Sequence, residues 1–192
     1  MSTGGPRFAE LKVEELNAAQ RPLADRVMRE IKRASLSGPF SIMLRCPGMA
    51  AGMIETFEYY RLRTGLDPRL KELAILILAR EWTADFEWYA HKPAAERAGL
   101  AAATIEELRL GRRPATLKPD EAIVYDFATA LVRERGVSDA VFAAARDLLG
   151  EERLIDLAAL LGEYMKVALL LGLGRVGVPA GQELPPLEGR TR

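Results

Sequence analysis

The stretch "RLKELAILILAREWTADFEWYAHKPAAERAGL", residues 69–100, decides how this chain folds. Its run from Leu73 to Leu78 is apolar on every side, so it predicts a helix that is buried in the middle of the protein. Asp67 can cap the start of this helix, and Pro68 suits its first position. The sequence therefore predicts a central, fully enclosed helix over "DPRLKELAILILAREW".

A second helix is predicted directly after the first. It begins near Thr83 or Asp85 and runs toward Gly99. Pro93 should kink it or restart it, because proline lacks the backbone donor and clashes with the preceding turn.

Helical signals are dense in the rest of the chain and strand signals are scarce. Residues Glu14 to Ser35 read as one amphipathic helix, and residues 36–52 interrupt the pattern with glycines and prolines. "TIEE", Thr104 to Glu107, reads as a capping box that opens another helix. The other predicted helices are Met49–Thr64, one from Pro119 ending at Gly136, one from Ser138 closed by Gly150, and Glu152–Leu171.

These elements predict an all-α fold with a single domain of about seven helices joined by short loops. We expect an N-terminal helical arm over residues 1–37, the main domain over 38–180 and an irregular tail over 181–192.

The balance of charge limits the classes of partner. The 192 residues carry 27 basic and 27 acidic side chains, so the formal net charge is +0. Binding to nucleic acid or to an anionic membrane calls for clustered positive charge, and the sequence therefore predicts neither. The most apolar window, residues 154–174, contains Asp156, Glu163 and Lys166, which makes it too polar for a membrane span.

The single cysteine, Cys46, excludes an intrachain disulfide framework and favours a reducing compartment. The N-terminus lacks the basic-then-apolar layout of a signal peptide. We therefore expect a cytoplasmic protein.

Three polar side chains in the opening stretch are candidates for chemistry. His91 is the only histidine, and Glu87 precedes it by four residues, so both face the same way on a helix. Such a pair can pass a proton near neutral pH. If the two helices pack antiparallel around the Trp82–Thr83 turn, Glu72 also reaches the second helix near His91.

Non-catalytic interpretations of these three residues stay open. Glu87 and His91 can form an ordinary surface pair, or His91 can be a core histidine with a satisfied partner. Glu72 can belong to an exposed stripe with Lys71. The aromatic side chains around the pair argue against a solvated face: they are Trp82, Phe86, Trp88 and Tyr89.

The stretch resembles the signature region of the carboxymuconolactone decarboxylase family, which shares its fold with the alkyl hydroperoxidase D-like proteins. The resemblance runs from about Gly38 to Pro179 and includes "GPFSIMLRCPGMA" and the late helix around Tyr164. Its most specific elements are Glu72, the pair Glu87–Trp88, and His91. The resemblance implies an alkyl hydroperoxidase D-like helical fold.

The peroxidase branch of that superfamily carries a Cys-x-x-Cys pair just before the equivalent histidine. The matching positions here are Ala84 and Glu87, so the redox pair is absent. A dithiol peroxidase cycle needs a reactive thiolate and a resolving partner. The resemblance therefore favours the decarboxylase-type branch, and Cys46 leaves a single-thiol peroxidase as the alternative.

The resemblance also implies a reaction, the removal of CO2 from 4-carboxymuconolactone, and roles for the candidate residues. His91 is the expected donor or proton shuttle. Glu87 would orient it or act as a general acid, and Glu72 would set the charge state of the pair.

Substrate binding would fall to other side chains. An apolar wall for the departing carboxylate would come from Trp88, Phe86 and Tyr164. Arg45 would hold a second substrate carboxylate, or form an ordinary surface ion pair. Glu72, Glu87 and His91 can in principle ligate a metal ion, but nothing else in the chain supports this, so no cofactor and no metal are expected.

We therefore expect a cofactor-free acid/base enzyme that acts on a small unsaturated lactone or carboxylic acid of aromatic-compound catabolism. The alternatives are peroxidase activity through Cys46 and a non-catalytic helical oligomer. The resemblance implies a homo-oligomer, a trimer or hexamer. The apolar segment "VALLLGLG", residues 167–174, agrees with such an interface.

Overall fold

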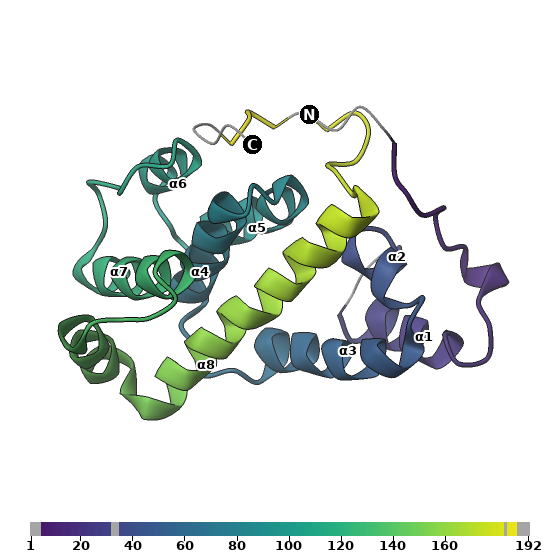
Figure 1. Cartoon of the computed structure of the whole chain (residues 1–192), viewed down its shortest axis with the longest axis horizontal. Coiled ribbons are helices and arrows are strands. Elements are labelled where there is room, and N and C mark those ends of the chain that lie inside the picture. Colours follow the sequence, from purple (N-terminus) through teal and green to yellow (C-terminus); the bar gives the residue numbers. More distant parts are fainter. Residues whose placement is uncertain (1–4, 32–34, 183, 188–192) are drawn as a thin grey trace. The chain divides into compact units, whose positions relative to one another are not determined.

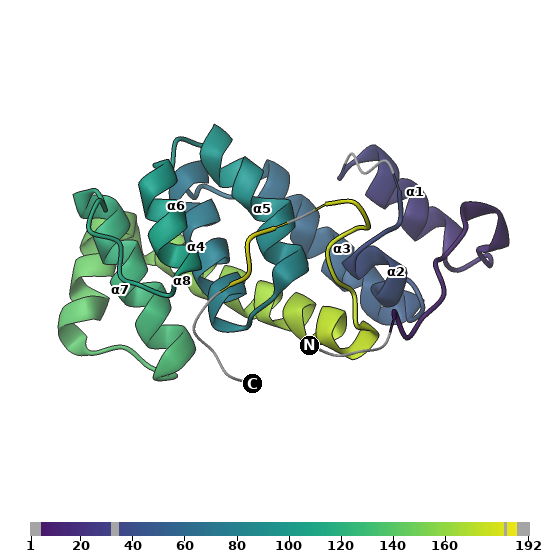
Figure 2. The ribbon, with the colours of Figure 1, turned by 90° about the horizontal axis from the view of Figure 1, so that it is seen from above.

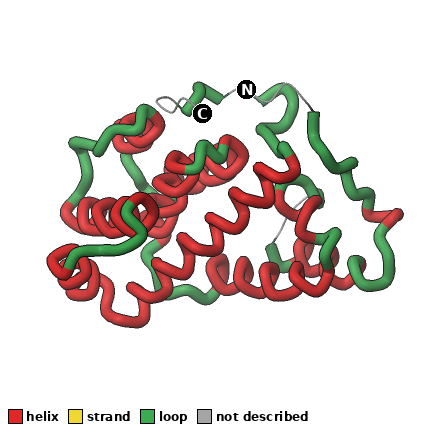
Figure 3. The backbone as a smooth tube through the Cα atoms, in the orientation of Figure 1, coloured by secondary structure: helices red, strands yellow, loops and turns green. Residues whose placement is uncertain are grey.

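The computed structural model describes residues 5–31, 35–182 and 184–187, and every regular element in these ranges is helical (Figure 3). The all-α prediction is confirmed. A short 3-10 turn, Val13–Glu15, precedes eight α-helices, labelled in Figure 1. They are α1 (Arg21–Arg29), α2 (Pro39–Met43), α3 (Pro47–Leu62), α4 (Pro68–Glu81), α5 (Asp85–Arg97), α6 (Ala102–Arg109), α7 (Pro119–Arg133) and α8 (Asp139–Gly174).

The chain divides into two compact units. The first contains residues 1–64 and 169–177, and the second contains residues 65–168 and 178–192. The division into an arm, a main domain and a tail that the sequence suggests stays a prediction. None of the helices in the described residues is long and apolar enough to cross a membrane.

In the first unit, α1 and α2 both pack against α3, as Figure 2 shows. The amphipathic helix α1 buries Ala24 and Val27. Its Arg26 binds Glu58 of α3 through two hydrogen bonds of 3.0 and 2.7 Å. This two-pronged pair joins α1 to α3 in addition to the apolar contacts.

The single helix predicted over Glu14–Ser35 is wrong. The Asn17 side chain accepts hydrogen bonds from the backbone N–H groups of Ala19 and Gln20, each at 3.0 Å. Such a turn competes with helix formation. Pro22 then suits the first turn of a new helix, so α1 begins at Arg21, and residues 32–34 lie outside the described part.

The segment read as an interruption contains a short helix, α2. Gly38 precedes it with φ 68° and ψ −138°, a backbone conformation that favours glycine, and Pro39 takes the first helical position. The glycine and proline that interrupt the apolar pattern are therefore the same residues that start α2.

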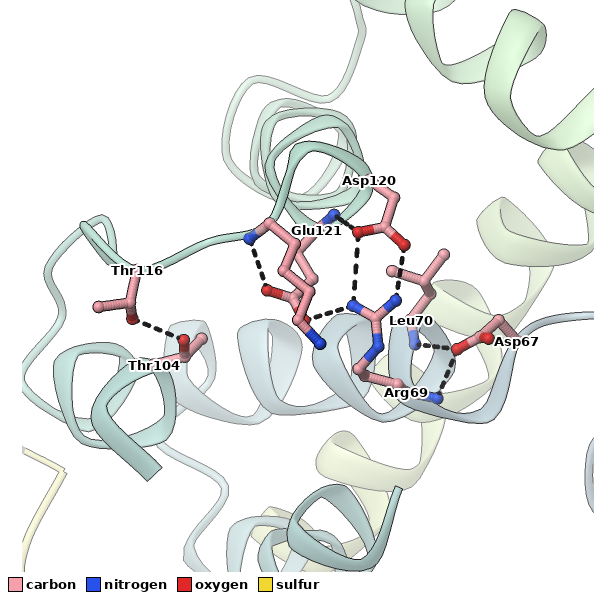
Figure 4. Close-up of polar contacts among 8 residues, drawn as sticks. Asp67, Arg69, Leu70, Thr104, Thr116, Asp120 and Glu121 are labelled. Carbon is pink, nitrogen blue, oxygen red and sulfur yellow. Dashed lines mark hydrogen bonds and ion pairs between the residues drawn. The ribbon is translucent and has the colours of Figure 1, made fainter. Parts of the chain in front are cut away.

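In the second unit, α5, α6 and α7 all pack against α4 (Figure 1). As predicted, α4 is enclosed: Leu73, Leu76 and Leu78 are fully buried. The predicted cap is also confirmed. The Asp67 carboxylate accepts hydrogen bonds from the backbone N–H groups of Arg69 at 2.9 Å and Leu70 at 3.2 Å (Figure 4).

The helix start predicted at Thr104 is wrong, because α6 begins at Ala102. Thr104 is buried inside that helix, and its hydroxyl lies 2.9 Å from the Thr116 hydroxyl (Figure 4). The side chain thus ties α6 to the loop before α7 and does not cap the helix.

The helix break predicted at Gly150 is confirmed. This residue has φ 75° and ψ 164°, which only glycine adopts readily, and it divides α8 into two helical segments. The longer segment carries Tyr164, which brings this helix to the candidate site described below.

Candidate active site

The candidate site starts from the turn between α4 and α5. The chain reverses over Trp82–Ala84, where Thr83 takes a positive φ of 50°, and α5 then packs along α4. One continuous α5 contains both Glu87 and His91 and passes through Pro93. This local arrangement brings Glu72, near the start of α4, to His91 on α5.

His91 is held by a carboxylate from the neighbouring helix. Its Nδ1 lies 2.8 Å from Oε2 of Glu72. A carboxylate accepts from an N–H, so this contact fixes the tautomer with hydrogen on Nδ1. The Nε2 atom makes no hydrogen bond within the described residues and is the nitrogen left for chemistry.

His91 is half-buried, with 21% of its side chain exposed, and the Glu72 side chain is 11% exposed. The imidazole is thus neither an open surface group nor an enclosed core histidine. The Tyr164 ring from α8 meets it edge-on, with the ring centroids 4.9 Å apart and an angle of 87° between the planes. Three helices together fix the position of this ring.

Glu87 is placed differently from Glu72. Its side chain is 2% exposed, and neither carboxyl oxygen has a hydrogen-bond partner within the described residues. Burial raises its pKa to about 8, because a charged carboxylate is poorly solvated there. Glu72, and not Glu87, orients His91, while Glu87 is mainly a neutral acid at pH 7.

The aromatic residues around the site fall into two groups. Phe86 and Trp88 are buried on α5, and Tyr89 is half-buried with its ring centroid 6.2 Å from that of Phe86. Trp82 is exposed, so it does not contribute to the enclosure that the sequence suggested. Two of these aromatic side chains, Phe86 and Trp88, are thus buried on the same helix as Glu87.

Arg45 and Cys46 belong to the first compact unit, whereas the His91 cluster belongs to the second. The Arg45 guanidinium donates to the carbonyls of Ser41, at 3.1 Å, and Ala9, and lies 5.1 Å from the centre of the Phe8 ring. Neither an acid partner nor the His91 cluster appears among these contacts. Cys46 is exposed and immediately precedes α3.

One buried acid near the site, Glu163, was not among the candidate residues that the sequence predicted. Glu163, next to Tyr164 on α8, is 6% exposed, and only one of its oxygens is paired, with Lys166 at 2.7 Å. The sequence did contain a sign of this burial, because Glu163 lies within the most apolar window of the chain. Among the described residues, no three histidine, cysteine, aspartate or glutamate side chains are grouped to hold a metal ion.

Comparison with solved structures places this geometry in a known fold. The chain is similar to a protein from Ralstonia eutropha JMP134 described as an alkylhydroperoxidase AhpD core, an uncharacterized peroxidase-related protein. The TM-score is 0.76 with 15% sequence identity, over 91% of this chain and 93% of the other. At this identity the likeness shows an alkylhydroperoxidase D-like fold.

A scan against protein-family models found no match, and a search of curated proteins also found none. Fold and site therefore define an all-helical protein that has an alkylhydroperoxidase D-like fold and an imidazole bound to a carboxylate.

Proposed function

We propose that this chain is a cofactor-free enzyme that moves protons with His91 and Glu72, and that its reaction is a decarboxylation of the carboxymuconolactone decarboxylase type. The observation that carries this proposal is the 2.8 Å contact between Nδ1 of His91 and the Glu72 carboxylate, which leaves Nε2 for a substrate. Imidazoles held in this way serve as general acids and bases near neutral pH.

The proposed substrate is a small unsaturated lactone acid. The bond between the ring carbon and its carboxylate breaks, CO2 leaves, and the electron pair moves through the C=C bond onto the lactone carbonyl oxygen. Nε2 of His91, which takes up a proton from solvent before the reaction, donates that proton to carbon and is protonated again by solvent for the next turnover. Glu72 holds the ring and stabilises its protonated form throughout.

The buried aromatic side chains support this assignment. Trp88 and Phe86 provide an apolar environment on α5, and Tyr164 contacts the imidazole edge from α8. Apolar surroundings favour loss of a carboxylate as neutral CO2. In this proposal these three side chains form the wall around the departing group. That Arg45 holds a second substrate carboxylate stays a prediction from the resemblance.

Peroxidase activity is the second candidate, favoured by the similarity to the Ralstonia eutropha protein, which is described as peroxidase-related. In this chain the reaction would use Cys46, which is exposed. The acid/base function is preferred because Ala84 and Glu87 stand where the peroxidase branch has its cysteines, and because His91 is bound to a carboxylate.

The test is CO2 release from a panel of unsaturated lactone acids that includes 4-carboxymuconolactone. We expect His91→Ala to lower turnover at least about 100-fold, the usual contribution of general acid–base catalysis. Cys46→Ala should leave turnover intact. Glu96→Gln is the matched control, since Glu96 lies on the same helix but forms a solvent-exposed pair with Lys92.

Hydroperoxide reduction by the same variants separates the two candidates. Hydroperoxide turnover that is lost in Cys46→Ala and kept in His91→Ala would replace the decarboxylase proposal with the peroxidase. If the chain neither releases CO2 nor reduces hydroperoxides, the non-catalytic alternative holds.

The assembly and location of the protein belong to the same proposal: a cytoplasmic homo-oligomer, trimer or hexamer, that binds a small molecule. Large apolar side chains exposed on α8 support an interface, namely Ile155, Leu169 and Leu173. Sedimentation velocity at several concentrations measures the assembly directly, and a monomer at all of them would contradict it.

A further inference from the structure

Glu87 is the charged residue of the site that the proton-transfer scheme does not use. Both of its oxygens are buried without a hydrogen-bond partner within the described residues. Native proteins leave few buried polar atoms unpaired, because each costs about 1–3 kcal/mol. An orphaned carboxyl group of this kind therefore needs an explanation.

The other buried glutamates in the second unit show what is usual for this protein. Each has at least one partner: Glu72 binds His91, Glu81 binds Arg133, Glu121 binds Arg69, and Glu163 binds Lys166. Glu87 is nevertheless at least as buried as most of them, at 2% exposure. The absence of a partner is thus specific to the residue that shares a helix face with His91.

The position of Glu87 makes a ligand the natural partner. It precedes His91 by four residues on α5, a spacing at which Cβ atoms lie about 5–6 Å apart on one helix face. His91 is partly exposed and Glu87 is enclosed. Glu87 and His91 thus lie on one helix face, and a small planar molecule that binds Nε2 of His91 is a candidate partner for the Glu87 carboxyl group.

The protonation state of Glu87 decides what it can offer. A neutral carboxyl group has one O–H donor, whereas a carboxylate only accepts. Burial is the only cause that acts on the pKa of Glu87, and it keeps the group protonated below about pH 8. No side chain within the described residues hydrogen-bonds to either oxygen of Glu87.

We propose that Glu87 acts as a neutral hydrogen-bond donor to the ligand oxygen on which negative charge develops. The inference rests on the proposed function, in which the electron pair released with CO2 moves onto the lactone carbonyl oxygen. Glu87 keeps its proton and its hydrogen bond shortens as that oxygen becomes an oxyanion, while His91 protonates carbon. Donors placed in this way are commonly the largest single contribution to catalysis, and a buried neutral acid can serve as one.

The experiment uses 4-nitrophenolate, a planar oxyanion whose absorbance reports binding without turnover. Glu87→Leu removes the donor, whereas Glu87→Gln keeps an N–H donor in a side chain of similar shape. We expect Glu87→Leu to weaken 4-nitrophenolate binding at pH 7 by about 10-fold or more, the usual loss for a hydrogen bond to a charged group. Glu87→Gln should lose about 3-fold or less.

Two controls make the result specific. Glu163→Gln changes another buried glutamate with an unpaired oxygen, and it should bind 4-nitrophenolate like the wild type. The uncharged probe 4-nitroanisole should bind equally well to wild type and Glu87→Gln. Equal 4-nitrophenolate binding by wild type, Glu87→Leu and Glu87→Gln would overturn the proposal, and so would binding that is lost equally in Glu87→Gln and Glu87→Leu.

This outcome is separate from that of the proposed function. If no lactone acid releases CO2 but oxyanion binding depends on Glu87, the donor role stands and the assigned reaction fails. If CO2 is released with His91 but Glu87→Leu binds 4-nitrophenolate normally, the reaction stands and the donor role fails.

Discussion

Two buried acidic clusters in the second compact unit are built in opposite ways. Where α4 and α7 begin, Arg69 binds both Asp120, at 2.6 Å, and Glu121 (Figure 4). Glu121 also accepts a hydrogen bond from the backbone N–H of Lys118 at 2.8 Å. Every carboxylate in this cluster has a partner, and it joins the starts of two helices.

The cluster around His91 satisfies only one of its two acids. Glu72 binds the imidazole, and Glu87 has no partner within the described residues. A cluster in which every buried carboxylate is paired stabilises the fold. A buried carboxyl group without a hydrogen-bond partner lowers stability unless a ligand binds it. The difference between the clusters is therefore a difference between a structural and a functional use of the same residue types.

The largest expected effect comes from Glu87→Gln and concerns stability against pH. The pKa of Glu87 rises from 4.5 in the unfolded chain to about 8 in the folded one. Between these values the unfolded chain loses its proton and the folded chain keeps it, so stability falls as pH rises. Urea unfolding should show wild type losing about 4 kcal/mol between pH 5 and pH 8 relative to Glu87→Gln.

The same experiment can contradict the contrast between the His91 cluster and the Arg69 cluster. Identical pH dependence for wild type and Glu87→Gln would mean that Glu87 is ionised and paired in solution, and the contrast with the Arg69 cluster would disappear. A Glu87→Gln variant that is more stable than wild type at pH 8 but not at pH 5 would support the contrast.

Next in size is Arg69→Met, which leaves Glu121 buried without its cation. We expect a loss of about 3 kcal/mol in the free energy of unfolding at pH 7, the usual cost of breaking a buried pair from one side. Adding Asp120→Asn and Glu121→Gln should recover part of this loss, because the uncompensated charges are then removed. Binding of 4-nitrophenolate should not change in the variants that fold.

The Arg69 cluster should also respond to pH in the opposite sense. The hydrogen bond from Arg69 lowers the pKa of Asp120 below its usual value of 3.8. Its contribution is therefore present above that value and is lost as pH falls through the lower, folded-state pKa. An acid unfolding midpoint that is unchanged by Arg69→Met would contradict this assignment.

Glu72→Gln tests the contact between Glu72 and His91, and it should lower turnover more than it lowers stability. An amide oxygen can still accept from Nδ1–H of His91, but it carries no charge to stabilise an imidazolium. We expect CO2 release to slow by about 100-fold with little change in KM. An equal loss with Lys71→Gln, a change at the adjacent position on α4, would point to a general disturbance of that helix.

The sequence predicted Glu72 near His91 because both lie at known positions on two helices joined by a short turn. It also predicted the buried α4, the Asp67 cap and the Gly150 break, which depend on local pattern and backbone sterics. These features need no knowledge of distant residues.

The rest of the site depends on packing that no local pattern encodes. The i,i+4 spacing suggested that Glu87 would orient His91, but burial and partners are set by helices from elsewhere in the chain. Tyr164 was expected as a wall and contacts the imidazole itself. The prediction of one long helix over Glu14–Ser35 was wrong for the converse reason. The apolar residues there have helical spacing, but a local turn at Asn17 prevents the helix from starting before Arg21.

The smallest effect is expected for Arg113→Ala. This variant tests whether burial causes the larger stability losses predicted for the buried clusters. Arg113 binds Asp126 at 2.8 Å, but both side chains are about half exposed, at 49% and 46%. Its guanidinium also lies 5.2 Å from the centre of the Tyr125 ring. Exposed pairs are screened by water, so we expect a change of about 0.5 kcal/mol or less in thermal or urea unfolding. A loss near that of Arg69→Met would mean that charge pairing, and not burial, decides what these clusters contribute.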